Sequence, residues 1–226
     1  MGVSFKRIYI AVFICLIIYL STFILEGCSS NQINSNVIID NEVNSTINEI
    51  NFLGETKKSA LFIIAQDKFR DDELEIPYLA LKDAGIDVKV ASITNEMSKG
   101  MLGKEIIPDL IVKEVKIQDY DAIIIVGGSG APELADHIEV ISLLNNAKNS
   151  NKIIAAICFG PVVLAKAGIL ENKRATVFAT DDSQKALIEG GAHLIRQNVV
   201  RDDNIITANG PSASEQFANE LLIALT

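Results

Sequence analysis

Short apolar runs alternate with longer amphipathic segments from about residue 60 to the end of the chain. Six runs rich in Val, Ile and Ala predict strands at residues 60–65, 88–93, 122–126, 153–157, 175–179 and 204–208. Segments between several of these runs, and after the last one, predict helices at residues 72–84, 132–147, 161–167, 183–189 and 212–225. Strands that alternate with helices pair in parallel through crossover connections, and the helices cover both faces of the sheet. The pattern therefore predicts an α/β fold with a mostly parallel sheet.

Two of the predicted strand regions, residues 123–126 and 153–157, are apolar throughout and do not alternate. Continuous apolar runs are typical of central strands that are buried on both faces. In an open parallel sheet, ligands bind at the carboxyl ends of the strands, so the residues that follow each strand are the first place to look for chemistry. Residues 102–115 interrupt the alternation and predict irregular or hairpin structure between two crossovers.

Apolar residues are concentrated at the start of the chain. Residues 1–27 contain 19 of them, and two basic residues precede an uncharged stretch at residues 8–25. A basic region followed by an apolar one is typical of an export signal. The signal ends at Leu25-Glu26-Gly27-Cys28, which resembles a bacterial lipobox with an unusual Glu26 and predicts lipidation of Cys28. An uncleaved anchor helix is the alternative, because about 18 residues can just span a bilayer.

Both interpretations tether the rest of the chain to the extracytoplasmic side of the cell membrane. Residues 28–58 are rich in Asn and Ser and contain no long apolar run, which predicts a flexible linker. The folded domain is expected at residues 59–226. Because the apolar excess lies in residues 1–27, the high mean hydropathy of the whole chain, +0.28, describes the export segment rather than the domain.

Charge and composition exclude several classes of function. The net charge of −9 leaves no excess of basic residues to neutralise phosphates, so no nucleic-acid partner is expected. Three Cys are too few and too scattered for a disulfide scaffold or a structural zinc site. The only two histidines, His137 and His193, are expected to be surface residues or to have their hydrogen bonds satisfied, and we expect no metal and no cofactor. If Cys15 is removed with the signal and Cys28 is lipidated, Cys158 is the only free thiol.

Cys158 lies where a predicted buried strand turns into a predicted helix. The sequence Ala156-Ile157-Cys158-Phe159-Gly160-Pro161 has small residues two before and two after the cysteine, and Pro161 suits the first turn of a helix. This pattern resembles the nucleophile elbow, a tight turn that exposes the reactive side chain. A helix N-terminus behind the sulfur predicts a thiol more acidic than free cysteine. An inert Cys packed beneath the helix is the alternative.

Two other strand ends carry candidate site residues. Gly127-Gly128-Ser129-Gly130 follows the third predicted strand, and its backbone N–H groups, together with that of Phe159, are suited to an oxyanion. A turn that needs Gly only for steric reasons is the alternative. Asp71 is a predicted N-cap, which places Glu73 in the first turn of a helix, where acidic residues usually only interact with the helix dipole. Pro77 predicts an irregular turn, because it cannot donate a hydrogen bond to the carbonyl of Glu73.

Taken together, these strings resemble the ThiJ/PfpI family, which includes the parkinsonism-associated protein deglycase, the PfpI-type proteases and glyoxalase III enzymes. The matching strings are FRDDELEIP at residues 69–77, VGG at 126–128, AAICFGP at 155–161 and TANGP at 207–211. The resemblance covers about residues 59–226. It implies a flavodoxin-like three-layer α/β sandwich that forms a homodimer.

The same resemblance implies roles for individual residues. Cys158 matches the reactive cysteine, and Glu73 matches the glutamate whose protonated carboxyl hydrogen-bonds the sulfur of that cysteine. Gly128 and the backbone amide of Phe159 match the oxyanion-binding groups. Gly127 and Asn209 lie in the matching motifs and are accessory candidates.

The chain departs from the family pattern at its histidines. PfpI-type proteases have His directly after the cysteine, where this chain has Phe159, and the deglycase has a His in the strand that matches residues 175–179, where this chain has Phe178. Asn209 occupies a position where Arg is often found. Amide hydrolysis needs an acid for the leaving nitrogen, which Phe cannot supply, so a cysteine peptidase is the least favoured function.

Two functions remain. A thiolate adds to an aldehyde or ketone to give a hemithioacetal, and a neighbouring carboxyl can carry the proton. This chemistry predicts a glyoxalase- or deglycase-like enzyme that acts on a small carbonyl substrate, a 2-oxoaldehyde, with Cys158 as nucleophile and Glu73 as acid and base. The alternative is a non-catalytic redox-sensing or stress-response module in which Cys158 is oxidised to sulfenic or sulfinic acid.

Overall fold

The structure, a computed structural model, describes residues 57–226. The predicted export segment at residues 1–27, the lipidation site at Cys28 and nearly all of the predicted linker lie outside the described residues. The described residues belong to one compact unit, Thr56–Thr226. Within residues 57–226, none of the helices combines the length and the apolar character needed to cross a membrane.

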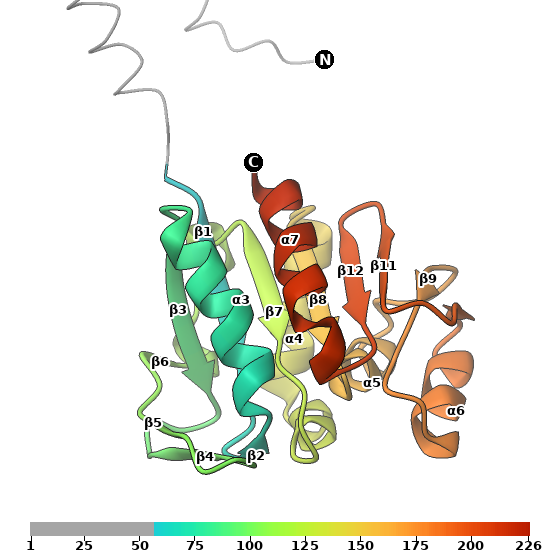
Figure 1. The fold of residues 1–226 in the computed structure, drawn as a ribbon, viewed down its shortest axis with the longest axis horizontal. Helices are drawn as coiled ribbons and strands as arrows, with labels where there is room; N and C mark the ends of the chain where they lie inside the picture. Colours follow the sequence, from blue (N-terminus) through green and yellow to red (C-terminus); the bar gives the residue numbers. More distant parts are fainter. Residues whose placement is uncertain (1–56) are drawn as a thin grey trace, which may run out of the picture. The chain divides into compact units, whose positions relative to one another are not determined.

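The centre of the fold is a seven-stranded sheet that is parallel except at one edge (Figure 1). In spatial order its strands are β11 (Val199–Asp202), β12 (Ile205–Ala208), β8 (Ile153–Ile157), β7 (Ala122–Ile125), β1 (Ser59–Ile63), β3 (Asp87–Ser92) and β6 (Leu110–Ile111). Within this sheet β11 alone runs antiparallel to its neighbour. β7 and β8, the two continuous apolar runs, are adjacent central strands, as their composition predicts.

Helices cover both faces of the sheet. α3 (Asp71–Asp83) and α7 (Ser214–Leu225) lie side by side on one face, and α4 (Ile138–Asn149) and α5 (Gly160–Lys166) lie on the other (Figure 1). Alternate residues of β1 point to the two layers, because Phe62 packs with side chains of α3 and α7, whereas Leu61 packs with those of α4 and α5. The predicted three-layer, flavodoxin-like α/β sandwich is therefore confirmed.

Short elements surround the carboxyl edge of the sheet. β2 (Asp67–Phe69), β4 (Ser98–Gly100) and β5 (Glu105–Ile106) form a small second sheet, β9 (Arg174–Ala175) pairs with β10 (His193–Leu194), and α6 (Asp181–Glu189) lies between β9 and β10 in sequence. Short 3-10 helices are η1 (Val112–Glu114), η2 (Ile117–Asp119), η3 (Ala131–Asp136) and η4 (Pro211–Ala213). The irregular or hairpin structure predicted at residues 102–115 is confirmed in part, because this range contains the turn and second strand of the β4–β5 hairpin but also β6 of the central sheet and η1.

Two predicted elements are shorter than expected. The helix predicted at residues 132–147 is divided into η3 and α4, because His137 between them has an extended backbone with φ −100° and ψ 113°. The strand predicted at residues 175–179 is reduced to β9. Beyond β9 the backbone N–H of Thr176 donates to the side-chain hydroxyl of Thr207 (2.9 Å) instead of to a neighbouring strand.

Two further features differ from the sequence prediction. β11 was not predicted, although its partner β12 was, and the two are joined by a tight turn in which Asp203 has φ +57°. The irregular turn predicted at Pro77 is wrong, because α3 runs unbroken through this residue. Pro77 is buried and costs the helix one backbone hydrogen bond, and the packing of α3 against α7 keeps the remainder helical.

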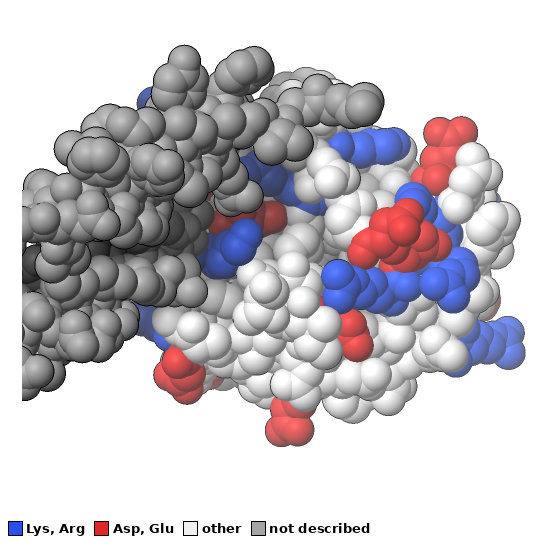
Figure 2. Space-filling view, turned by 90° about the horizontal axis from the view of Figure 1, so that it is seen from above, with Lys and Arg blue, Asp and Glu red and all other residues white. Residues whose placement is uncertain are grey.

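Charged side chains of both signs lie next to one another on the surface. Figure 2 shows Lys and Arg beside Asp and Glu on one face of the molecule. Lys173 pairs with Asp202 (3.4 Å) and Asp203 (2.6 Å), and Arg174 also pairs with Asp202 (3.5 Å). Each of these positive charges therefore has a partner on the protein itself.

Candidate active site

The predicted site residues meet at the carboxyl edge of the central sheet. Cys158 follows β8 directly, Gly127 lies two residues after the end of β7, and Glu73 lies in the first turn of α3. A Cβ atom at position 127 would collide with Oε2 of Glu73 and with Cβ of Cys158, so these two side chains lie against the same glycine. The sequence placed the three residues at one edge, and the structure brings them into one cluster.

Cys158 has the backbone of a nucleophile elbow. Its φ is +61°, in the left-handed region that non-glycine residues seldom adopt, and its side chain is 6% exposed. Two hydrogen bonds fix this conformation: the Cys158 N–H donates to the carbonyl of Ala208 (2.9 Å), and its carbonyl accepts from the N–H of Phe178 (3.0 Å). α5 begins directly after Phe159, at Gly160. A strained, fixed cysteine at a strand end indicates a functional role.

The glycine-rich turn has steric reasons as well as candidate chemistry. Gly128 has φ +103°, and a side chain there would collide with the carbonyl of Lys68 and the N–H of Arg70. The carbonyl of Gly127 accepts from the N–H of Arg70 (3.0 Å). The steric interpretation of this turn is therefore confirmed, and the close packing that requires Gly also brings the turn to the start of α3 and to Cys158. A role in oxyanion binding stays a prediction.

Glu73 is a completely buried acid with an unusual protonation equilibrium. Its side chain has no exposed surface, and among the described residues neither carboxyl oxygen has a hydrogen-bond partner. Burial raises the pKa of Glu73 to about 7, and the negative charge of Asp72 adds to this shift. The nearby Cys158 thiol, the positive charge of Arg70 and the backbone of Gly127 each lower the pKa of Glu73, but they offset only part of this rise. Near neutral pH the group is therefore poised between acid and base.

The thiol of Cys158 is less acidic than the sequence predicts. Burial, followed by the negative charge of Glu73, raises the pKa of Cys158 to about 12. The backbone N–H groups of Gly128 and Phe159 act in the opposite direction and lower this pKa. The prediction of a thiol more acidic than free cysteine is therefore wrong, because a helix N-terminus does not offset burial beside a carboxylate. Protonation of Glu73 removes its negative charge and with it the second cause of the raised Cys158 pKa.

The two backbone N–H groups that act on the sulfur are those predicted to bind an oxyanion. Gly128 and Phe159 belong to different strand ends, yet the N–H groups of both lower the pKa of Cys158. Groups that favour negative charge on the sulfur are also placed to favour negative charge on an oxygen bonded to a carbon that the sulfur attacks. The cluster thus contains a thiol, a carboxyl group of raised pKa and two backbone N–H groups that favour negative charge.

An aromatic pair occupies the two positions where family members carry histidine. The rings of Phe159 and Phe178 lie edge to face, with centroids 5.3 Å apart and an interplanar angle of 63°. Phe178 is 41% exposed, and it contacts Cys158 through the backbone. These two positions therefore present an apolar surface in place of imidazole rings.

The remaining sequence candidates lie elsewhere. Asn209 donates through its side-chain amide to Asn198 (3.3 Å) and lines a separate pocket of about 370 Å³ with Arg196. His137 lies 3.7 Å from Glu139, and His193 is exposed on β10. Within residues 57–226, no three His, Cys, Asp or Glu side chains are grouped in a way that could hold a metal ion.

A pocket of about 410 Å³ opens beside the elbow. Its walls come from the glycine-rich turn, η3, the elbow with the start of α5, and the start of α6; the lining residues are Ser129, Pro132, Phe159, Val162, Thr180, Asp182 and Ser183. The hydroxyls of Thr180 and Ser183 are engaged in the capping box of α6. Asp182 is the only charged residue of the lining, so the wall nearest the elbow is apolar.

The prediction that Asp71 is the N-cap of a helix is wrong. Arg70, not Asp71, precedes the first residue of α3, and no side chain caps this helix. The Asp71 carboxylate instead accepts from the backbone N–H groups of Leu102 (2.8 Å) and Lys104 (2.7 Å) in the β4–β5 hairpin. Hydrogen bonds over this sequence separation leave no periodic signal, so the pattern alone could not predict this contact.

Comparison with known proteins places the chain in a family. The model of the DJ-1/PfpI family matches residues 58–224. An uncharacterized protein of Methanocaldococcus jannaschii is 40% identical over 73% of this chain and 81% of its own length. A glutathione-independent glyoxalase of Caenorhabditis elegans is 32% identical over 75% of this chain and 89% of its own length.

Solved structures agree with this match. The crystal structure of a ThiJ/PfpI domain protein from Brachyspira murdochii superposes with a TM-score of 0.72 at 32% identity, covering 75% of this chain and 98% of that one. The fold, the elbow and the family match point to the same conclusion. The chain belongs to the DJ-1/PfpI family.

Proposed function

We propose that this protein is a cysteine-dependent, glyoxalase-like enzyme that acts on 2-oxoaldehydes. The observation that carries the proposal is the contact between the Glu73 carboxyl and Cys158 at Gly127, in which an acid with a pKa of about 7 adjoins a thiol in a strained elbow. A group poised near neutral pH is suited to take a proton and return it within one reaction. The glyoxalase relative from Caenorhabditis elegans supports the substrate class.

The first step follows from the positions of these groups. Sγ of Cys158 attacks the aldehyde carbon, the thiol proton passes to the Glu73 carboxylate, and the carbonyl electron pair moves to oxygen. The N–H groups of Gly128 and Phe159 stabilise this oxyanion. Glu73 then protonates the oxygen to give a hemithioacetal. The high thiol pKa is compatible with this step, because Glu73 removes the proton as the sulfur attacks.

The overall reaction needs no external oxidant. Moving a proton and an electron pair from the aldehyde carbon to the ketone carbon oxidises the first and reduces the second, which gives a 2-hydroxyacyl thioester. Water then cleaves the bond between the acyl carbon and sulfur and releases a 2-hydroxy acid and the thiol. The Phe159–Phe178 pair supplies no acid for a leaving amine, so peptide hydrolysis is disfavoured.

Turnover of methylglyoxal by the purified chain tests the proposal. We expect Cys158→Ser to abolish turnover and Glu73→Gln to reduce it by roughly a hundredfold or more, because general acid–base catalysis contributes about this much. His137→Gln is the matched control, since this histidine contacts Glu139 at the surface and should leave turnover unchanged. Equal turnover by Cys158→Ser and the unmodified chain would refute the proposal.

A redox role is the second candidate. Cys158 is the one free cysteine within the described residues, so no partner thiol there competes for its oxidised form. Peroxide would transfer oxygen to the sulfur, with cleavage of the O–O bond and release of water, and a second equivalent would give the sulfinic acid. Mass spectrometry after peroxide treatment tests this role. An unmodified thiol would exclude it and leave the enzyme as the proposal.

We also propose that residues 1–27 export the chain, that a lipid on Cys28 holds it at the extracytoplasmic side of the cell membrane, and that the domain forms a homodimer. The basic and apolar regions and the lipobox-like sequence support the first two statements. The resemblance to dimeric family members supports the third. Light scattering of the purified domain measures the oligomeric state, and a monomer at micromolar concentration would overturn the third statement.

A further inference from the structure

We propose that Asp71 is a positioning residue for the Cys158–Glu73 pair. In this proposal its buried carboxylate holds the β4–β5 hairpin against the start of α3 and, through the hairpin, holds the glycine-rich turn. The inference rests on the proposed function, in that Glu73 and Cys158 are taken as the reacting pair. Asp71 acts through the elements that it joins.

The contacts of Asp71 are short and enclosed. The side chain is 6% exposed, and its two carboxylate oxygens accept from the N–H groups of Leu102 (2.8 Å) and Lys104 (2.7 Å). Gly100 packs against the same carboxylate, and a Cβ atom at this position would lie 2.5 Å from its carbon and both oxygens. Charge-assisted hydrogen bonds of this kind are roughly twice as strong as neutral ones. The turn at residues 100–104 is therefore shaped around this carboxylate.

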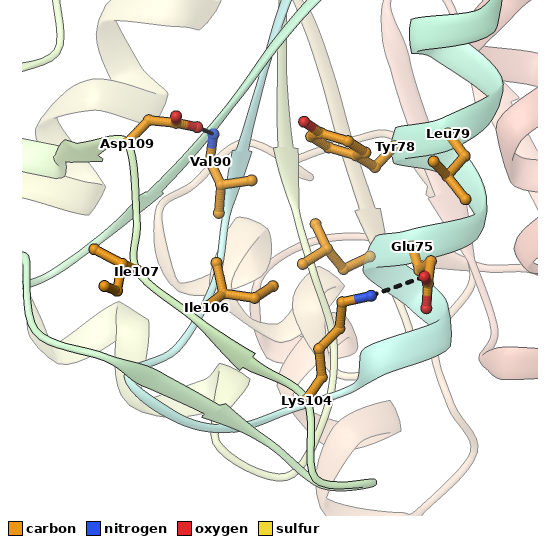
Figure 3. A pocket seen from close by; sticks show the side chains of 9 residues that line it. Glu75, Tyr78, Leu79, Val90, Lys104, Ile106, Ile107 and Asp109 are labelled. Carbon is orange, nitrogen blue, oxygen red and sulfur yellow. Dashed lines mark hydrogen bonds and ion pairs between the residues drawn. The ribbon is translucent and has the colours of Figure 1, made fainter.

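Helix geometry explains how one turn of α3 faces both the hairpin and the elbow. Successive helical residues are about 100° apart, so residues 71 and 75 lie on one side of α3 and residue 73 lies on the other. Glu75 pairs with Lys104 of the hairpin (2.8 Å), as Figure 3 shows. The Glu75 side chain is 49% exposed, so this pair is screened by solvent. Of the two acidic residues that bind the hairpin, Asp71 is the buried one, and it lies two residues before Glu73.

The hairpin also touches the glycine-rich turn. The N–H of Ser129, the residue after Gly128, donates to Sδ of Met101 (3.4 Å), and the Met101 N–H donates to the carbonyl of Phe69 (2.8 Å). Met101 lies between Gly100 and Leu102, so its backbone is set by the contacts of Asp71. The hairpin thus connects the helix that carries the acid to the turn that carries an oxyanion donor.

The hairpin is small and partly exposed. β4 has three residues and β5 has two, and Met97, Met101 and Leu102 around them are 46–63% exposed. Besides Asp71, the parallel pairing of β4 with β2 and the Lys104–Glu75 pair hold it in place. Loss of the Asp71 contacts should loosen the hairpin and the first turn of α3, and admit water to Glu73. The charged groups that act on Glu73 are Arg70 and Asp72, with the Cys158 thiol from the elbow, and none of them changes when Asp71 is replaced. Replacing Asp71 also removes a negative charge, which lowers the pKa of Glu73 by itself. A shift that also occurs in a variant that keeps this charge would therefore report geometry.

The pH dependence of Cys158 alkylation by iodoacetamide, with methylglyoxal kinetics in parallel, tests the proposal. Asp71→Asn keeps the side-chain size, but its amide nitrogen would face one of the two N–H groups. We expect kcat to fall on the order of tenfold. We also expect the inflection due to Glu73 to move down by roughly half a pH unit or more, because hydration relieves the desolvation that raises its pKa. Glu75→Gln is the control, and its profile should match that of the unmodified chain.

Gly100→Ala provides a second variant that leaves Asp71 in place. Its added methyl group would displace the carboxylate, and we expect the same downward shift of the alkylation inflection. Because this variant keeps the charge of Asp71, it decides the question. An unchanged inflection in folded Gly100→Ala would overturn the proposal. If the unmodified chain fails to turn over methylglyoxal, the proposed function fails, while the alkylation profile still decides the role of Asp71.

Discussion

Glu73 combines complete burial with the lack of a hydrogen-bond partner for either carboxyl oxygen within the described residues. Burial of an ionised carboxylate without a partner is costly, so a residue of this kind reduces the stability of the fold. Three other acidic residues of α3, at positions 71, 72 and 75, are each held by hydrogen bonds or ion pairs. The cost at Glu73 is accounted for if its carboxyl exchanges protons with Cys158 in the reaction.

Stability should therefore depend on pH through Glu73. Its pKa is about 7 in the folded chain against 4.5 when exposed, so between these values the folded state binds more protons than the unfolded state. Stability falls as pH rises through this window, by roughly 3 kcal/mol in all. Glu73→Gln mimics the protonated form and should remove this part of the dependence. Urea unfolding of both proteins between pH 4.5 and 8 measures the difference, and parallel curves would contradict the assignment.

Gly127 is the second residue whose replacement should be decisive. A methyl group there would collide with Glu73, with Cys158 and with the carbonyl of Ile157, all parts of the site. We expect Gly127→Ala to reduce methylglyoxal turnover by roughly a hundredfold, as small displacements of reacting groups do. Gly168→Ala is the matched control, because φ is +71° there and nothing lies within 4 Å of the added atom. The control should cost about 1 kcal/mol of stability and leave turnover unchanged.

At the scale of elements, the alternation of strands and helices predicted the architecture, because burial dictates it. β7 and β8 had to be central, since an apolar strand is stable only where both of its faces are covered. The elbow at Cys158 was equally predictable, because a strand, a cysteine, a glycine and a proline at fixed spacing encode a tight turn into a helix. Local sequence patterns thus account for the parallel sheet and for the elbow at the end of β8.

Elements held by contacts distant in sequence were missed. The segment after β9 is fixed by the bonds of Thr176 to Thr207 and of Phe178 to Cys158, neither of which has a periodic signature. The acidity of the thiol was mispredicted for the same reason: the helix behind Cys158 is visible in the sequence, whereas its burial against Glu73 is not. β11 is different, because two valines followed by an acidic turn and the two isoleucines of β12 are a hairpin signal that could have been used.

The elements around the pocket beside the elbow should set substrate preference. Phe159 forms part of its apolar wall with Val162, and Asp182 is its one charge. We expect an apolar group on the carbonyl substrate to occupy this pocket. Phe159→Ala should then lower the ratio of kcat/KM for phenylglyoxal to that for glyoxal by roughly five- to tenfold. Ile188→Ala, on the exposed surface of α6, should leave the ratio unchanged. An unchanged ratio in Phe159→Ala would place the substrate elsewhere.

At the scale of the whole molecule, charge and apolar residues bear on membrane attachment. Within the described part of the chain, the cores on the two faces of the sheet are built from residues 60–225. The apolar excess lies in residues 1–27, and the 20 basic and 29 acidic residues of the chain leave a net negative charge. A net negative charge is repelled by an anionic membrane surface. The proposed attachment therefore relies on the start of the chain rather than on surface charge.

That conclusion gives the last prediction. Expressed in full in a bacterium supplied with an alkyne-bearing fatty acid, the chain should carry the label and sediment with membranes. Cys28→Ala should lose the label, and Cys158→Ala, which removes a different cysteine, should keep it. An unlabelled chain that still sediments with membranes would favour the anchor helix at residues 8–25, since about 18 apolar residues suffice to span the bilayer. A chain that neither labels nor sediments would exclude both forms of tether.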